Sequence, residues 1–212
     1  MKIGIIGSGN VGGTLGRRWA KNGHAVIFST REPSSAAVRE LLAQAGPTAK
    51  SASVRDAARE SEVLLLATPW EAAQNALASA GDLTGKILID ATNPLLPGLG
   101  GLAVGTTTSA GEMVAKWAAG ARVVKAFNTV GFNIMADPRF EGGRAAMFYC
   151  GDDAKAKSAV AGLINELGFE ALDAGPLTQS RLLEPFCLLW ISLALQYGYG
   201  REIGFHLLRR KN

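Results

Sequence analysis

The stretch KIGIIGSGNVGG, Lys2 to Gly13, decides the fold of this 212-residue chain. An apolar strand pattern leads into Gly7, Gly9 and Gly12, which form a complete G-x-G-x-x-G sequence where a helix is predicted over residues 10–21. The first glycine permits a tight turn, the second lets a pyrophosphate approach the backbone, and the third lets the helix pack closely on the strand. The free amides of a helix N-terminus bind phosphate groups. The motif therefore predicts a dinucleotide site made of Gly7, Ser8, Gly9, Asn10, Val11 and Gly12.

Apolar, strand-like runs alternate with alanine-rich helical stretches over residues 2–127. We expect strands over residues 2–7, 24–29, 48–51, 62–68, 86–92 and 121–127, with helices between them. Pro33 suits the first turn of one of these helices, which we expect to run to about Ala45. This alternation is typical of a doubly wound parallel sheet, an α/β fold in which ligands bind beyond the carboxyl ends of the strands.

The regular alternation of strands and helices changes after Thr129. A strand is predicted around residues 145–151, an amphipathic helix over residues 153–168, a short strand over residues 169–175 and a long apolar helix over residues 178–195. No linker rich in proline or serine separates this part from the rest. We therefore predict a Rossmann domain over residues 1–128 and a small C-terminal α/β appendage over residues 129–212, which supplies the substrate crevice and dimer contacts.

Composition excludes several classes of function. The net charge is +4, but the basic residues are scattered, so no nucleic-acid partner is expected. The longest apolar run, residues 186–195, is shorter than the ~20 residues needed to cross a bilayer, and glycines interrupt the apolar opening stretch. We expect a cytoplasmic protein without membrane contact. Two cysteines and two histidines, far apart in the chain, predict buried free thiols and no metal site.

The end of the second predicted strand indicates which dinucleotide is bound. An acidic residue that holds the ribose hydroxyls of NAD is common here, but this chain has Ser29, Thr30 and Arg31. Two hydroxyls and a guanidinium can donate hydrogen bonds to a 2′-phosphate, which favours NADP. Glu32 lies near the position of an NAD-type acid, and the alternative is that Glu32 and Arg31 form a surface ion pair.

The loops after the later strands are expected to surround the reacting rings. After the fourth strand, Pro69 and Trp70 could form a wall beside the nicotinamide half of the cofactor. The alternative is that Pro69 starts a helix and that the indole of Trp70 is buried. The long Gly/Pro-rich loop over residues 90–101 is a candidate lid or substrate wall. Asn93 and Asn128 follow adjacent strands, so their amides could orient a planar ring. The predicted substrate site consists of Asn93, Pro94, Leu95, Asn128 and Thr129, with Asn93 shared with the cofactor.

No histidine, cysteine or lysine is obviously placed as a general acid, base or nucleophile, so no catalytic side chain is predicted. A carbonyl or alcohol dehydrogenase normally needs a proton donor near the hydride. Hydride transfer to a conjugated ring needs mainly proximity of the two rings. The pattern therefore favours a ring acceptor.

Several segments together identify a resemblance to a known family. They are residues 7–32, ATPWEAA (67–73), NPL (93–95), VVKAFNT (123–129), CGDD (150–153) and, most specifically, LDAGPLTQSRLLEP (172–185). Over nearly its whole length the chain resembles coenzyme F420-dependent NADP oxidoreductases. The resemblance implies a homodimer and hydride exchange between NADP(H) and the 8-hydroxy-5-deazaflavin of coenzyme F420. It also implies that Ser8 and residues 10–12 line the pyrophosphate, that residues 29–31 face the 2′-phosphate, and that Thr68, Pro69, Asn93 and Asn128 border the rings.

Two other functions remain open at this point. The Asn-Pro-Leu and Lys-Ala-Phe-Asn-Thr segments are also similar to the cytosolic domains of membrane ferric reductases, so a flavin, quinone or ferric reductase is an alternative. A non-catalytic NADP(H)-binding regulator is the second alternative. The Gly-rich loop after Asn93 favours a second ligand, and therefore an enzyme.

Overall fold

A computed structural model describes residues 1–30 and 32–210 of the chain. Arg31, one of the three predicted 2′-phosphate ligands, lies outside the described residues. Eight strands form one sheet in the order β10-β9-β6-β5-β4-β1-β2-β3. Their bounds are β1 Lys2–Ile6, β2 Ala25–Ser29, β3 Ala49–Ala52, β4 Val63–Leu66, β5 Ile87–Asp90, β6 Arg122–Lys125, β9 Ala146–Gly151 and β10 Glu170–Asp173.

The first six strands are all parallel, in the order expected for a doubly wound sheet. Strand β9 pairs antiparallel with β6, and β10 pairs parallel with β9. The predicted α/β fold class is confirmed. The C-terminal strands extend the same sheet, so residues 1–128 and 129–212 share one continuous hydrogen-bonded layer.

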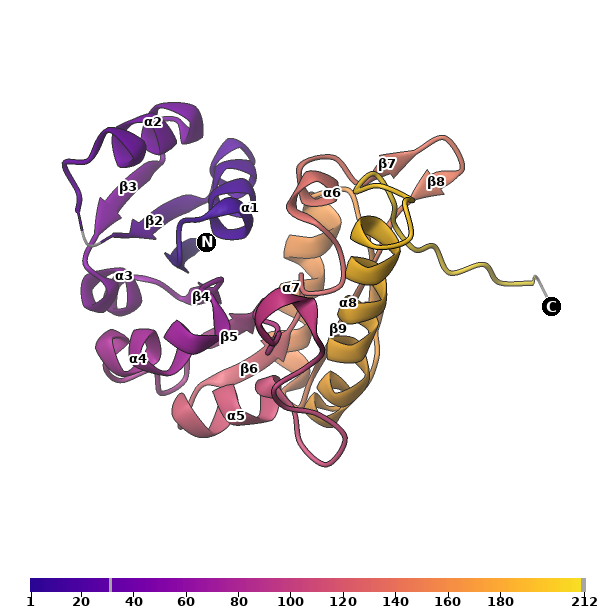
Figure 1. The fold of residues 1–212 in the computed structure, drawn as a ribbon. Coiled ribbons are helices and arrows are strands. Elements are labelled where there is room, and N and C mark those ends of the chain that lie inside the picture. Colours follow the sequence, from indigo (N-terminus) through magenta and orange to yellow (C-terminus); the bar gives the residue numbers. More distant parts are fainter. Residues whose placement is uncertain (31, 211–212) are drawn as a thin grey trace.

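Helices cover both faces of the sheet (Figure 1). One apolar cluster joins the sheet to α1, α2, α6 and α7, and the second joins it to α3, α4 and α5. The strands between them are buried on both sides, as their continuous apolar sequences require. The helix bounds are α1 Asn10–Lys21, α2 Ala36–Ala45, α3 Val54–Glu60, α4 Trp70–Ala80, α5 Ala110–Trp117, α6 Phe132–Ala136 and α7 Ala154–Glu166.

Helix α2 begins later than predicted. Pro33 lies in a turn, and the first helical residue is Ala36. Ser35 sets this boundary because its hydroxyl accepts a hydrogen bond from the backbone N–H of Val38. The prediction that Pro33 occupies the first turn was therefore wrong, because the capping serine decides where the helix starts.

The C-terminal part wraps around the β6–β9 side of the sheet. It contains a small hairpin, β7 Arg139–Phe140 and β8 Gly143–Arg144, and a helix, α8 Ser180–Leu195, which follows the 3₁₀ turn η2 Leu177–Gln179. The segment after α8 returns to the sheet, where the Ala146 N–H donates to the Phe205 carbonyl. Figure 1 shows the described part of the segment after this contact extending away from the rest of the molecule. Within residues 1–30 and 32–210, no helix combines the length and apolar character needed to span a bilayer.

One face of α8 is apolar and exposed. Leu182 and Leu189 are 66% and 49% exposed, and Leu195 at the end of the helix is 46% exposed. The opposite face of α8, which includes Leu183 and Cys187, is buried. Contiguous exposed apolar surface of this kind is typical of an interaction surface.

Candidate functional site

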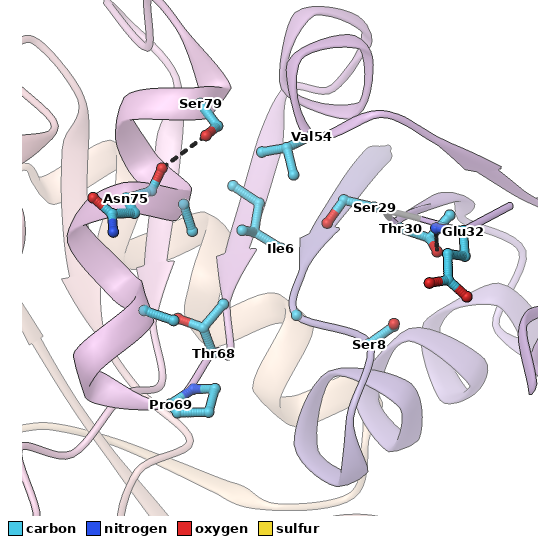
Figure 2. Close-up of a pocket in the computed structure, with 13 residues that line it drawn as sticks. Ile6, Ser8, Ser29, Thr30, Glu32, Val54, Thr68, Pro69, Asn75 and Ser79 are labelled. Atoms are coloured by element: carbon cyan, nitrogen blue, oxygen red, sulfur yellow. Dashed lines mark hydrogen bonds between the residues drawn. The ribbon is translucent and has the colours of Figure 1, made fainter.

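A cavity of about 900 Å³ lies at the carboxyl ends of β1, β2 and β4. Its volume is within the range of small-molecule sites. Figure 2 shows Ser29, Thr30 and Glu32 on one side of it, with Asn75 and Ser79 of α4 on the other. The complete lining is Ile6, Gly7, Ser8, Ser29, Thr30, Glu32, Val54, Thr68, Pro69, Ala72, Asn75, Ala76 and Ser79.

Gly7 makes the turn from β1 into α1 with φ +102°, a conformation that favours glycine. A Cβ atom on Gly7 would lie 2.6 Å from the carbonyl oxygen of Ala67, so only glycine fits at this position. Gly9 differs, because a Cβ atom built on it would meet nothing within 4 Å. The space in front of Gly9 is therefore available to a ligand.

The N-terminus of α1 has no side-chain cap, in contrast to four other helices. Ser35, Ser53, Ser109 and Asp153 cap α2, α3, α5 and α7, and each accepts a backbone N–H of the first turn. At α1 the capping position is Gly9, which has no side chain to accept those amides. Uncapped amides together with the helix dipole bind an anion such as a pyrophosphate.

The corner after β2 carries both hydroxyls expected from the sequence. Ser29 and Thr30 line the cavity, and Ser29 is 6% exposed. The Thr30 hydroxyl oxygen accepts the N–H of Glu32 at 3.1 Å, so its O–H remains to donate. The exposed Glu32 side chain also lines the cavity (Figure 2), where a carboxylate opposes an anionic ligand.

The α4 side of the cavity was not foreseen. Ala72, Asn75, Ala76 and Ser79 occupy one face of α4, and Val54 at the start of α3 completes the wall. Small apolar side chains beside a polar amide form a slot suited to a flat heteroaromatic base. The three- and four-residue spacing on α4 is the signal that could have identified these positions.

Thr68 follows β4 and lines the cavity, and Pro69 follows it as the capping residue of α4. The Thr68 hydroxyl oxygen is buried and has no hydrogen-bond partner among the described residues. A buried hydroxyl without a partner is unfavourable, so a ligand group at this point would satisfy it. Both readings of Pro69 apply, since it starts α4 and lines the cavity.

Asn93 and Asn128 meet, as their positions after β5 and β6 suggested. The Asn93 side-chain N–H donates to the Asn128 carbonyl at 3.0 Å, and the Asn128 side-chain N–H donates to Asn93 Oδ1 at 3.1 Å. The second N–H of Asn128 donates to the Leu183 carbonyl on α8 at 3.0 Å. Asn128 is 2% exposed, whereas Asn93 is half-buried and retains one amide N–H. Neither residue lines the cavity described above.

The remaining predicted substrate residues are less exposed to a ligand than Asn93. Thr129 is 1% exposed, and its hydroxyl lies 3.9 Å from the sulfur of Met147. Pro94 is buried, and Leu95 is half-buried in a small bridge with Leu102. The loop after β5 is therefore a folded hairpin that includes a 3₁₀ turn, η1 Pro97–Leu99.

A buried charge cluster near Asn93 and Asn128 was missed. Lys125 at the end of β6 is fully buried, and its Nζ lies 2.8 Å from Asp90 Oδ2 and 3.0 Å from Glu184 Oε1. Burial lowers the pKa of Lys125, but the charges of Asp90 and Glu184 outweigh that effect and raise the pKa above its ordinary value. The two carboxylates thus favour the protonated form of Lys125. The signal for such a cluster was an aspartate and a lysine at the ends of apolar strands and a glutamate within an apolar helix, because buried charges need partners.

Both histidines lie away from these loops. His24 precedes β2 and pairs with Glu166 at 2.7 Å, and His206 belongs to the C-terminal segment. Burial raises the pKa of Cys150 to about 11 and of Cys187 to about 12, so neither thiol is a nucleophile at neutral pH. In the part of the chain that the structure describes, no cluster of three His, Cys, Asp or Glu residues could hold a metal ion.

The strand order, the glycine turn and the uncapped first helix define the Rossmann class of nucleotide-binding folds. A family model for "NADP oxidoreductase coenzyme F420-dependent" matches residues 2–94. The F420-dependent NADP reductase of Methanocaldococcus jannaschii is 31% identical over 210 residues, which cover 93% of this chain and 94% of that protein. The chain therefore belongs to the family of F420-dependent NADP oxidoreductases.

Two further comparisons bear on the fold and on the acceptor. A 1.70 Å crystal structure from Arthrobacter sp. FB24, described as a candidate F420-dependent NADP-reductase, has a TM-score of 0.90 and 35% identity, covering 99% of this chain and 100% of that one. Metalloreductase STEAP3 of Rattus norvegicus is 31% identical over 185 residues, which cover 86% of this chain but 36% of that protein. The chain is therefore also similar to part of a protein named as a metalloreductase.

Proposed function

We propose that the protein transfers a hydride between NADPH and the deazaflavin ring of coenzyme F420. The observation that carries this proposal is the similarity, over almost the whole length of both chains, to a relative named as an F420-dependent NADP reductase. When bound, NADPH supplies the hydride that the acceptor ring takes up. The side chains and backbone of this protein then bind, orient and shield the two rings.

The cavity residues divide the proposed NADPH site into two ends. The uncapped amides of α1 and the open space at Gly9 suit the pyrophosphate. Ser29 and Thr30, together with Arg31 from the sequence, suit the 2′-phosphate. We propose that Val54 and the α4 face hold the adenine, which leaves Thr68 and Pro69 toward the nicotinamide.

The proposed acceptor site lies beyond Pro69, where the loops after β5 and β6 meet. Asn93 is its central polar group, with Pro94, Leu95, Asn128 and Thr129 around it. Among the described residues no histidine or neutral lysine lies at this end of the sheet, since Lys125 is buried and ion-paired. A ring acceptor suits such a site, because proximity contributes most of the rate enhancement.

We also propose that residues 1–128 bind NADP(H) and that residues 129–212 complete the crevice and form a homodimer. The exposed apolar face of α8 supports the dimer. Both cysteines are free thiols, which suits a reducing compartment, and we place the reaction in the cytoplasm.

The deciding experiment is steady-state oxidation of NADPH by the pure protein with coenzyme F420, compared with FMN, FAD, a quinone and ferric citrate at equal concentration. We expect rapid bleaching of the deazaflavin alone. Preference for flavin or ferric iron would instead favour the alternative raised by the metalloreductase similarity. Tight NADPH binding in calorimetry without turnover of any acceptor would make the protein a regulator.

The coenzyme preference is tested with Arg31→Ala. Removing the guanidinium should weaken NADPH binding by at least about tenfold, or 1.4 kcal/mol, and leave NADH binding nearly unchanged. Equal weakening of both would contradict the assignment of this corner to the 2′-phosphate.

A further inference from the structure

The buried lysine belongs to a closed set of contacts that includes both crevice asparagines. Lys125 Nζ donates to the Thr92 carbonyl at 2.6 Å, and the next residue is Asn93. Asn93 and Asn128 bond each other, and Asn128 Nδ2 reaches the Leu183 carbonyl. The residue after Leu183 is Glu184, whose Oε1 lies 3.0 Å from Lys125 Nζ. These contacts therefore form a closed circuit that begins and ends at Lys125 Nζ.

Each member of this circuit comes from a different part of the fold. Lys125 ends β6, Thr92 follows β5, and Glu184 lies on α8. The carboxylate of Glu184 also accepts the N–H groups of Ala110 and Gly111 at 2.9 and 3.0 Å, which holds the first turn of α5. The circuit thus fixes the two ends of the loop between β5 and α5 against β6 and α8.

The ammonium of Lys125 is held by three partners. It donates hydrogen bonds to Asp90 and to the Thr92 carbonyl, and it forms an ion pair with Glu184. Asp90 is held in turn, because its Oδ1 accepts the N–H of Thr92 at 2.9 Å and the Thr92 hydroxyl at 2.7 Å. Asp90, Lys125 and Glu184 are all at most 1% exposed. A buried network in which these three charges are paired favours one arrangement of its members over others.

The backbone beside the circuit is also constrained. Phe127 lies between Lys125 and Asn128 and has φ +62°, which is uncommon for a residue with a side chain. It is 1% exposed and packs edge-on against Trp19, with ring centroids 5.7 Å apart. This conformation turns the chain after β6 so that Asn128 faces Asn93. Strained backbone of this kind clusters at functional sites, where the surrounding packing holds it.

From this circuit we infer that Lys125 is a positioning residue for the acceptor ring. The inference rests on the proposed function. Lys125 touches no ligand itself. It fixes the Thr92 carbonyl and Glu184, and thereby holds Asn93 with one amide N–H directed away from its internal partners and available to a bound ring. Asn128, whose two N–H groups are both used internally, supports Asn93. Its buried Oδ1 has no hydrogen-bond partner among the described residues and remains as an acceptor.

The test compares Lys125→Met, which keeps much of the volume but removes the charge, with the core variant Leu163→Ala. Leu163 in α7 is fully buried and is not a member of the circuit, so its truncation lowers stability and leaves the hydrogen bonds of Asn93 in place. A misplacement of about 1 Å costs about 100-fold in rate. We expect kcat/KM for the acceptor to fall by about 10- to 100-fold in Lys125→Met and to stay within about twofold in Leu163→Ala. Affinity for 2′,5′-ADP, which fills only the adenosine end, should be unchanged in both.

A second readout does not depend on turnover. The side-chain amide protons of Asn128, both of which are hydrogen-bonded, should exchange slowly with solvent in the wild-type protein, as followed by nuclear magnetic resonance, and much faster in Lys125→Met. If Lys125→Met does not fold, Glu184→Gln replaces it, because glutamine can still accept from Ala110 but no longer carries the charge. Unchanged exchange and unchanged kcat/KM in the folded variant would overturn the inference. Faster exchange in a protein whose wild type reduces no ring acceptor would refute the proposed function, and it would show that Lys125 orders the two asparagines without positioning a ring.

Discussion

Gly12 packs so closely on Gly7 that a Cβ atom on Gly12 would lie 1.9 Å from the Gly7 carbonyl oxygen. That atom would also lie 2.9 Å from the side chain of Ile5 on β1. The third glycine of the motif is therefore a packing requirement of the turn itself. It places the start of α1, with its uncapped amides, at the end of β1.

Gly12→Ala should consequently destabilise the protein even without ligand. The nearest atom belongs to the backbone and cannot move aside as a flexible side chain would. The free energy of unfolding should therefore fall by about 1–3 kcal/mol. Chemical denaturation of the ligand-free protein measures it. A free energy of unfolding equal to that of the wild type would show that the turn adapts.

Gly9→Ala should behave in the opposite way. Its Cβ atom meets nothing within 4 Å and its φ of −71° is accessible to alanine, so we expect wild-type stability. The added methyl group would occupy space proposed for the pyrophosphate, and NADPH affinity should fall by about tenfold, or 1.4 kcal/mol. Calorimetric titration with NADPH measures the affinity of each variant, and chemical denaturation measures its stability. Wild-type affinity in Gly9→Ala would place the pyrophosphate elsewhere.

Glu32 should weaken NADPH binding in the wild-type protein, because an exposed carboxylate lines the cavity beside Thr30. Glu32→Gln should raise NADPH affinity about two- to fivefold at low salt, with less gain at high salt because exposed charges are screened. NADH affinity serves as the control and should hardly change. Loss of affinity for NADH in the variant would mean that Glu32 binds the ribose hydroxyls.

The exposed face of α8 gives a prediction about assembly. Leu189→Glu places a charge in the proposed apolar contact and should convert a dimer to a monomer, as measured by light scattering after gel filtration. Ala78→Glu is a matched control, since Ala78 is exposed on α4, on a different part of the surface. A monomeric wild-type protein, or dissociation caused equally by both variants, would contradict the proposed dimer.

Both thiols should resist alkylation in the folded protein. Burial raises the pKa of Cys150 to about 11 and of Cys187 to about 12, so each stays protonated at pH 8, and the thiolate is the reactive form. Iodoacetamide at pH 8 should modify neither residue until the protein is unfolded. Mass spectrometry reads out the result, and rapid modification of the native protein would show that α8 opens.

Much of the Rossmann half could be predicted because its signals are local. The helix over residues 10–21 was predicted at its observed bounds, since Gly9 and the apolar spacing define its start. The start of α2 was misplaced because both Pro33 and Ser35 are helix-start residues, and only the hydrogen bond from Val38 distinguishes them. The cavity residues of α4 were missed although their spacing was visible, because nothing local indicates which helix face meets a ligand.

The sequence by itself determined the fold class, the glycine turn and the position of Asn93 and Asn128 after adjacent strands. Periodicity and glycine placement suffice for this, because burial and backbone conformation depend on near neighbours in the chain. Only the tertiary structure decided that Lys125 meets Glu184, 59 positions later by residue number, and that Asn128 turns both N–H groups inward. A buried ammonium is stable only beside carboxylates, and the fold brings these together from distant parts of the chain. The pattern of apolar residues therefore does not indicate which carboxylates they are.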